Sequence, residues 1–157
     1  MRTFRGTTEF EIPAGFQMHH VLPVAVFAGP AFGDAFARLR ADGFDLRYFN
    51  TNGLPLPATE EAANDSGRPL HRGPHRRYNA MVFERVAAIV REMDSRQYSL
   101  SARIEAVQRL LILIAALRRC LSGDRNWISL NSRDPMHSKA AFQNLDSAID
   151  ILWSATK

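Results

Sequence analysis

Cysteine is almost missing from this sequence. A single one, Cys120, occurs in 157 residues. A disulfide framework needs at least two cysteines, and a zinc knuckle needs several, so both kinds of scaffold are excluded. Cys120 falls in a stretch with a helical pattern, where we expect a small buried side chain.

Long apolar runs are also missing. The longest is "LLILIAAL", residues 110–117, whereas a helix needs about 20 apolar residues to cross a bilayer. The opening "MRTFRGTTEFEIPAG" lacks the apolar stretch of a secretory signal. We therefore expect a soluble protein with no membrane partner and no signal peptide, cytoplasmic when it is made. Any delivery to another compartment would depend on something outside this chain.

Acidic residues are fewer than basic ones. There are 16 Asp and Glu against 20 Lys and Arg, which gives a formal net charge of +4. Six arginines but one acid, Glu84, lie between residues 66 and 91. Such a balance favours acidic partners such as nucleic acid. The 46% apolar and 23% charged content is otherwise ordinary for a globular protein.

Glycine and proline concentrate in the first half, and the second half has the spacing of long amphipathic helices. This asymmetry predicts an α+β fold that is predominantly α, with a loop-rich site on a helical scaffold. We expect strands at residues 10–13 and 44–49, a long loop at 57–73, and helices at 31–42, 74–93 and 101–121 and from Asp134 onward. The apolar stripe of the second helix is expected to contain Val82, Val86, Ile89 and Val90.

Four of the five histidines occur in two pairs, His19 with His20 and His71 with His75. Neutral imidazole is a common ligand for zinc and related ions, and three protein ligands with one open position are typical of catalytic metal sites. Three or four of these histidines could form such a site. The remaining one, His137, is more simply explained as a surface or core side chain.

Pro74 determines where the second pair lies. Proline is favoured in the first turn of a helix and disfavours helical geometry at the residue before it. We therefore expect His75 in the first turn and His71 in the preceding loop. The start of a helix attracts phosphate, as do arginines. The surrounding sequence "PLHRGPHRRYN", residues 69–79, would thus suit a metal ion bound beside a phosphodiester.

Three segments carry a family resemblance. "MHHVLP", "GFDLRYFNTNGLPLP" and "HRGPHRRYN" follow one another over about residues 16–93. In this order they resemble the AHH group of nucleases in the HNH/endonuclease VII superfamily, often found as toxin domains of bacterial polymorphic toxins. Each segment alone is weakly specific, but together they are specific. Met18 stands where the family name has alanine, which removes no chemical group.

The resemblance implies a ββα-metal core over residues 16–96. A lead-in of residues 1–15 would precede it, and residues 97–157 would form two or three further helices packed on that core. It also implies that one divalent ion, Mg, Mn, Zn or Ni, is bound by His19, His71 and His75. His20 would be the general base, and Tyr78 would be a supporting residue.

An asparagine is expected to orient the base, and "FNTNG" offers two, Asn50 and Asn52. In an extended segment both would face the same side. We prefer Asn52, since it directly precedes the glycine. The side chains expected to hold flanking phosphates are Arg72, Arg76 and Arg77.

Adjacent residues of a regular strand point to opposite faces, so His19 and His20 should diverge. The ligand would then face the ion while the base faces the attacking water. Pro23 indicates that the strand twists or ends soon afterwards. The sequence alone does not decide this arrangement.

The implied function is a metal-dependent, largely non-specific endonuclease that hydrolyses DNA, with RNA as another possible substrate. An imidazole with a pKa of about 6.5 accepts a proton from water at neutral pH, as His20 would have to do. Because no cluster of carboxylates is available for a second ion, we expect one metal. The protein would act as an antibacterial toxin delivered into the cytoplasm of a target cell, and a small acidic immunity protein would be its partner.

Two other interpretations remain open. In one, the same histidines close a structural metal site in a non-catalytic nucleic-acid-binding module. Loss of cleavage with metal retained in His20→Ala would favour the enzyme, and loss of metal and folding would favour the module. In the other, the chain is a helical interaction protein with incidental histidines. The joint order of the three segments argues against the latter.

Overall fold

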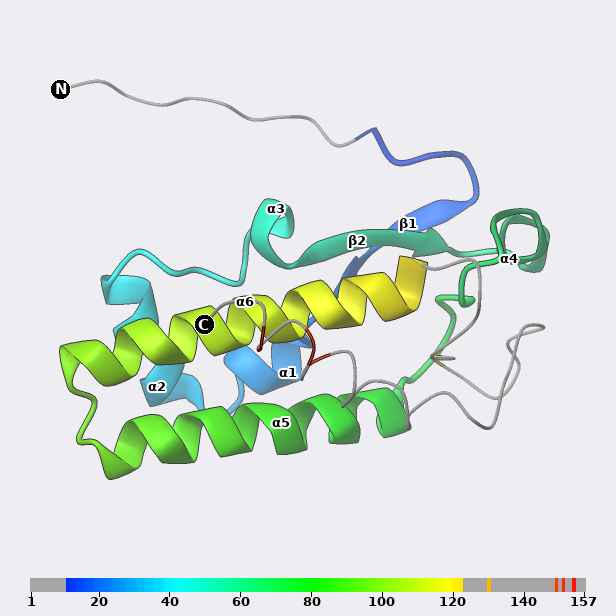
Figure 1. The fold of residues 1–157 in the computed structure, drawn as a ribbon. Coiled ribbons are helices and arrows are strands. Elements are labelled where there is room, and N and C mark those ends of the chain that lie inside the picture. Colours follow the sequence, from blue (N-terminus) through cyan, green and yellow to red (C-terminus); the bar gives the residue numbers. More distant parts are fainter. Residues whose placement is uncertain (1–10, 123–129, 131–148, 150, 152–153, 155–157) are drawn as a thin grey trace, which may run out of the picture.

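The computed structural model describes residues 11–122, 130, 149, 151 and 154. This part of the chain is mostly helical with one small antiparallel sheet, the α+β, predominantly α class that the sequence predicts (Figure 1). The elements in chain order are β1 (Phe16–His20), α1 (Val24–Phe27), α2 (Gly33–Ala41), α3 (Phe49–Asn52), β2 (Gly53–Pro57), α4 (Glu60–Ser66), α5 (Arg76–Ser95) and α6 (Leu100–Ser122).

The two long helices, α5 and α6, run antiparallel along the length of the molecule (Figure 1). Their bounds lie within two residues of those predicted for the helices at 74–93 and 101–121. Of the predicted stripe on α5, Val82 and Val86 are fully buried, and Ile89 and Val90 are partly buried against the core. Period and burial therefore agree along α5.

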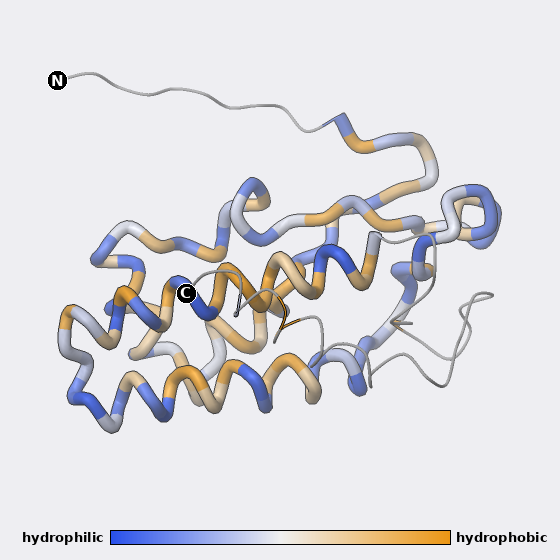
Figure 2. Tube along the Cα trace, in the orientation of Figure 1, coloured by the Kyte–Doolittle hydropathy of each residue, from blue (hydrophilic) through white to orange (hydrophobic). Residues whose placement is uncertain are grey.

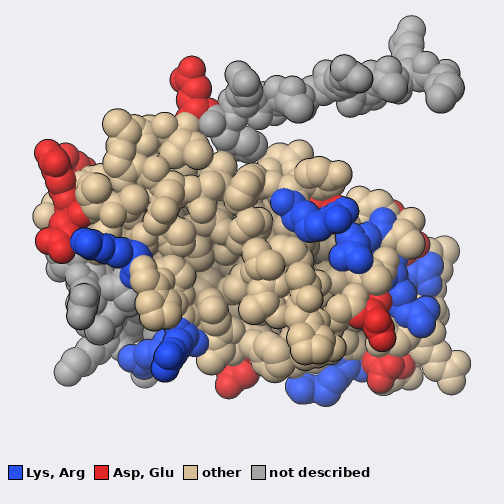
Figure 3. Space-filling model, turned by 180° about the vertical axis from the view of Figure 1, so that it is seen from behind, with Lys and Arg blue, Asp and Glu red and all other residues tan. Residues whose placement is uncertain are grey.

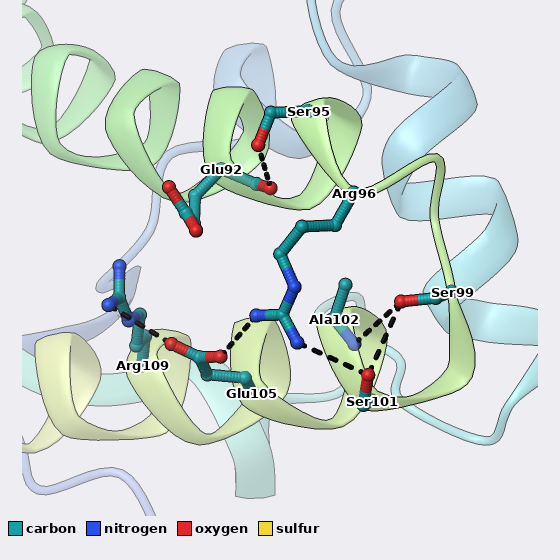
Figure 4. Close-up of polar contacts among 8 residues, drawn as sticks. All are labelled: Glu92, Ser95, Arg96, Ser99, Ser101, Ala102, Glu105 and Arg109. Carbon is teal, nitrogen blue, oxygen red and sulfur yellow. Dashed lines mark hydrogen bonds and ion pairs between the residues drawn. The ribbon is translucent and has the colours of Figure 1, made fainter.

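The turn between α5 and α6 is tight. Gln97 and Tyr98 both have positive φ, 51° and 53°. Beside them Arg96 forms an ion pair with Glu105, which also pairs with Arg109 one helical turn on (Figure 4). Partly exposed pairs of this kind contribute about 1 kcal/mol or less. Apolar packing between the helices is therefore the main force that holds them together.

One hydrophobic cluster joins the hairpin to the helices. Figure 2 shows apolar stretches along both long helices and hydrophilic residues over much of α4. The strands contribute Leu56, and the residues just after β1 contribute Val21 and Leu22. The α6 members of the same cluster are Ala102, Ala106, Leu110, Leu113, Ile114, Ala116, Leu117, Cys120 and Leu121.

β1 and β2 pair antiparallel although 32 residues separate them in sequence, from Val21 to Asn52. His19 lies opposite Leu54, and His20 lies opposite Gly53. The long connection contains α1, α2 and α3. It returns the chain so that the Asn-Gly segment lies beside the two histidines.

The prediction of a strand at residues 44–49 is wrong. The backbone there turns at Leu46 and Arg47, and α3 begins at Phe49. The Asp45 carboxylate accepts hydrogen bonds from the Arg47 backbone N–H at 2.9 Å and from its guanidinium at 2.6 Å, which closes the turn locally. Leu46 of this stretch instead packs in the hydrophobic core, where it is 2% exposed.

The region predicted as a loop, 57–73, contains α4. Thr59 caps its start by accepting a hydrogen bond from the Ala62 N–H, and Gly67, at a φ of 65°, ends it. Of the strand predicted at 10–13, residues 11–13 form no strand. The helix predicted from Asp134 lies outside the described residues, as does His137, except for Ile149, Ile151 and Ser154, which are helical. No helix in the described part of the chain is long and apolar enough to cross a membrane.

Candidate active site

Three histidines from separate parts of the chain converge. β1 carries His19, the segment after α4 carries His71, and His75 is the residue just before α5. Their ring centroids lie 4.7 Å apart for His19 and His71, 5.7 Å for His19 and His75, and 4.9 Å for His71 and His75. One ligand nitrogen from each ring lies within 4.8 Å of the other two. A single ion could therefore contact all three.

One nitrogen of each ring lacks a hydrogen-bond partner within the described part of the chain. His19 Nε2, His71 Nδ1 and His75 Nδ1 are buried and make no hydrogen bond. Buried polar atoms in proteins are normally hydrogen-bonded, so three such atoms in one place call for an explanation. A divalent cation satisfies all three at once, and three nitrogen ligands with an open position match a catalytic site. The residues present therefore fit the ion that the sequence predicts.

The protonation states also suit a metal. Burial, and then the neighbouring His71 and His75, lower the pKa of His19 to about 3. Burial and then His75 lower the pKa of His71 to about 4. The pKa of His75 is lowered by burial and partly restored by a hydrogen bond to the Leu130 backbone. All three rings are neutral at pH 7, the form in which imidazole binds metals.

Backbone contacts hold the ligands in place. The His71 N–H donates to the Pro57 carbonyl at 2.7 Å, and the Gln17 side-chain amide donates to the His71 carbonyl at 2.6 Å. These bonds attach the His71 segment to both strands. For His75, the bond to Leu130 fixes the tautomer that leaves Nδ1 available.

His20 lies on the other face of β1, as strand alternation predicts. Its ring packs against Phe49 at 4.5 Å and Phe27 at 5.9 Å between centroids, away from the three-histidine cluster. Burial lowers the pKa of His20, and a hydrogen bond to the Arg47 backbone raises it. His20 is thus a partly exposed imidazole with one ring nitrogen held by the Arg47 backbone.

Asn52 is fully buried and contacts backbone rather than His20. Its Oδ1 accepts from the Leu22 N–H at 2.7 Å, and its Nδ2 donates to the carbonyls of Leu22 at 2.9 Å and Leu46 at 3.1 Å. The direct bond to the base that we expected is not among the contacts of the described residues, because these backbone groups occupy the amide. The link is indirect, since Leu46 precedes the residue whose backbone bonds His20.

Asn50, the alternative, is exposed, and its Oδ1 accepts from the Thr51 N–H at 2.8 Å. The two asparagines do not share a face of an extended segment, because both belong to α3. The structure thus separates a buried, fully bonded Asn52 from a surface Asn50.

Tyr78 supports the end of β1. Its buried hydroxyl donates to the Val21 carbonyl at 2.6 Å, and its ring lies 5.5 Å from that of His19. Because Val21 directly follows His20, this contact from α5 fixes the strand end that carries both histidines.

The three arginines expected to hold phosphates are exposed. Arg72 directly follows His71 in sequence, and Arg76 and Arg77 begin α5 directly after His75. The N-cap residue, His75, makes no side-chain capping hydrogen bond, and the positive end of the helix dipole adds to the potential there. Basic side chains lie beside acidic ones at this end of the molecule in the view from behind (Figure 3).

Arg118 is a residue near the site that the sequence did not indicate. From α6, its Nη2 lies within 3.3 Å of the Asn50 carbonyl, 3.0 Å of the Thr51 carbonyl and 3.0 Å of the Gly53 carbonyl. An arginine near the end of an amphipathic helix normally indicates a solvated face. No local pattern predicts that it reaches the hairpin.

A model of a nuclease family of the HNH/ENDO VII superfamily with conserved AHH matches residues 2–116. The chain belongs to this AHH nuclease family. It is therefore a hydrolytic endonuclease, and its substrate is nucleic acid. No curated protein and no solved structure matches the chain.

In this AHH nuclease the matched stretch includes every residue proposed above from the resemblance, from His19 to Tyr78. It ends at residue 116, so Arg118 lies beyond it.

Proposed function

We propose that this AHH nuclease is a metal-dependent, largely non-specific endonuclease that cleaves DNA. His19, His71 and His75 hold one divalent ion, and His20 is the general base. The observation that carries the proposal is the convergence, on the face of β1 opposite His20, of three buried imidazole nitrogens that lack a hydrogen-bond partner among the described residues.

The chain's own groups supply most of the chemistry. His20 takes a proton from water, and its bond to the Arg47 backbone keeps the ring oriented for this. A bound divalent ion would stabilise charge on the phosphoryl and leaving oxygens. Arg72, Arg76 and Arg77 hold flanking phosphates. Phosphate contacts carry no base information, so cleavage should depend little on sequence.

The test is cleavage of supercoiled plasmid, single-stranded DNA and RNA, with EDTA and then with magnesium, manganese, nickel or zinc restored. His19→Ala and His20→Ala are assayed beside the wild type, together with metal binding by calorimetry. We expect wild-type nicking that EDTA abolishes, loss of both metal and cleavage in His19→Ala, and loss of cleavage with metal retained in His20→Ala. Removing a general base costs about 10²–10⁴-fold in rate.

The outcomes separate the alternatives. Cleavage that is unaffected by EDTA would disprove metal dependence, and cleavage of RNA alone would replace DNA as substrate. If His20→Ala lost metal and folding while no variant cleaved, the histidines would form a structural site. Asn50→Ala is the matched control, because Asn50 is exposed and its Oδ1 contacts Thr51.

We further propose that the protein acts as an antibacterial toxin domain with a cognate acidic immunity protein. The family resemblance and the net charge of +4 support this. An acidic partner over the exposed arginines would associate quickly through complementary charge. Co-purification should yield an acidic inhibitor that Arg76→Glu with Arg77→Glu releases. Capture of neutral or basic partners alone would contradict the proposal.

A further inference from the structure

Arg118 joins α6 to the junction of α3 and β2. A single nitrogen, Nη2, is 3.3 Å from the Asn50 carbonyl oxygen and 3.0 Å from those of Thr51 and Gly53. Nη2 carries two N–H groups, so three acceptors imply a shared, bifurcated bond. The contacts tie together the end of α3 and the first residue of β2.

The junction of α3 and β2 packs directly against His20. Gly53 is the residue that pairs with His20 across the sheet. The ring of Phe49, the first residue of α3, lies 4.5 Å from the His20 ring. Whatever fixes α3 and the start of β2 therefore fixes both the backbone partner and the ring neighbour of His20.

α3 depends on outside contacts for its position. It has four residues, and so short a helix is unstable on its own because nucleation is costly. The carbonyls at its end lack partners inside the helix. Arg118 supplies a donor to these carbonyls from a rigid 23-residue helix.

The Arg118 guanidinium is partly buried. Within the described part of the chain no carboxylate pairs with Arg118, and burial lowers its pKa. A partly buried cation without an anion requires other polar partners. The carbonyls of Asn50, Thr51 and Gly53 are those partners. The next residue, Arg119, is exposed and makes no such contact in the described chain.

We propose that Arg118 is a positioning residue for the reaction, acting on His20 through Gly53 and Phe49. Arg118 thereby completes the active site from just outside the stretch that the family model matches. The inference rests on the proposed role of His20 as the base. The proposed metal ligand His19 lies on the opposite face of β1, and His71 and His75 cluster with it, so metal binding should be little affected.

The experiment compares Arg118→Ala, Arg118→Lys and the matched control Arg119→Ala with the wild type, all carrying metal. Each is assayed on a fluorogenic DNA oligonucleotide for kcat and KM and by calorimetry for metal affinity. We expect kcat to fall about 10–100-fold in Arg118→Ala, since misplacing a reacting group by about 1 Å costs roughly that much. KM and metal affinity should stay within about twofold, and Arg119→Ala should keep the wild-type kcat.

Chemical rescue adds a test that general destabilisation would not pass. Guanidinium ion at millimolar concentration should restore part of the kcat of Arg118→Ala but none of that of His20→Ala. Arg118→Lys should recover little, because an ammonium group lacks the planar fork and the reach of guanidinium. If Arg118→Ala fails to fold, Arg118→Lys and its rescue carry the test.

Two results would overturn the inference. An unchanged kcat in a folded Arg118→Ala would show that the contacts have no role in positioning. A raised KM with unchanged kcat would make Arg118 a phosphate contact instead. Hydrogen exchange over residues 49–54 should also be faster in Arg118→Ala than in Arg119→Ala. Equal exchange would show that Arg118 does not stabilise the junction of α3 and β2. A wild type that cleaves nothing would instead disprove the proposed function. The exchange comparison would still show whether Arg118 stabilises the junction of α3 and β2.

Discussion

Among single residues, Asn52 is the one whose loss should cost most stability relative to its size. Asn52→Ala removes three buried hydrogen bonds to backbone groups of Leu22 and Leu46. Each backbone group left unpaired costs about 1–3 kcal/mol, so we expect the free energy of unfolding to fall by about 3 kcal/mol or more. Urea denaturation measures it. Asn50→Ala, at the exposed site, should change it by about 0.5 kcal/mol at most. Equal losses in both variants would contradict the distinction between the two asparagines.

The buried histidines make the stability of the metal-free protein depend on pH. In the folded state the pKa is about 3 for His19 and about 4 for His71, whereas an unfolded histidine titrates near 6.5. Between these values the unfolded chain binds more protons, so stability rises with pH. It is complete above about pH 6.5 and is lost progressively as the pH falls toward 4.

We therefore expect a lower urea midpoint at pH 5 than at pH 7.5 in EDTA. The difference should shrink in His71→Gln, which removes one of the titrating groups. A midpoint that is equal or higher at pH 5 in the wild type would show that these rings are not held neutral in the folded protein.

At the scale of elements, the backbone conformation of the loop between His71 and His75 depends on one glycine, Gly73. Gly73 has a φ of 81°, and an added Cβ would meet nothing within 4 Å. The cost of Gly73→Ala is therefore conformational, about 1–2 kcal/mol. Because the free loop can relax and the metal-bound loop cannot, we expect metal affinity to fall about tenfold, the change that 1.4 kcal/mol produces.

Gly33→Ala is the matched control, because Gly33 begins α2 in open space without a positive φ. It should leave metal affinity unchanged. Calorimetry on both variants decides. Wild-type affinity in Gly73→Ala would mean that the loop tolerates the substitution without moving its ligands.

Elements with a clear period were predictable from the sequence. α5 and α6 have apolar residues at helical spacing, and Gly43 follows the end of α2. Pro74 marked the start of α5 only approximately, because the helix begins at Arg76 and His75 is its N-cap rather than part of its first turn. The strand at 44–49 was predicted wrongly, because alternation alone does not show whether a partner strand exists. α4 was missed although its Thr59 cap and Gly67 stop are visible in the sequence.

Of the candidate site, the histidine cluster was predictable from the sequence, but the contacts that support it were not. The resemblance placed His19, His71 and His75 together, and the structure brings them together. The partners of Asn52 and Arg118 were not predictable, because both bind backbone carbonyls or N–H groups. Backbone groups are the same at every residue, so no side-chain pattern indicates which of them a buried amide or guanidinium reaches.

On the scale of the whole molecule, the strands and α6 share one hydrophobic cluster. The cluster that contains Val21, Leu22 and Leu56 of the hairpin region also contains Leu110, and further α6 residues to Leu121. The strand region and α6 thus pack into one hydrophobic cluster. A chain of residues 1–96 would expose this apolar surface to water. The exposure would cost about 25 cal/mol of folding free energy for each Å².

We therefore predict that a fragment of residues 1–96 does not fold alone. Domains have marginal stability, about 5–15 kcal/mol, and the loss of α6 removes side chains such as Leu110, Ile114 and Leu117, each of which is 2% exposed or less. Burial of one such side chain contributes about 1.5–3 kcal/mol. Circular dichroism and the amide dispersion of a proton–nitrogen spectrum should show an unfolded chain, with or without zinc.

A fragment of residues 1–122, which keeps α6, is the control and should give a dispersed spectrum. It lacks Leu130, whose backbone bonds His75, so we expect its metal affinity to be lower than that of the full chain. A folded 1–96 fragment that binds metal as tightly as the full chain would contradict both points. The hairpin and α5 would then be sufficient for the site, and α6 would contribute only a surface.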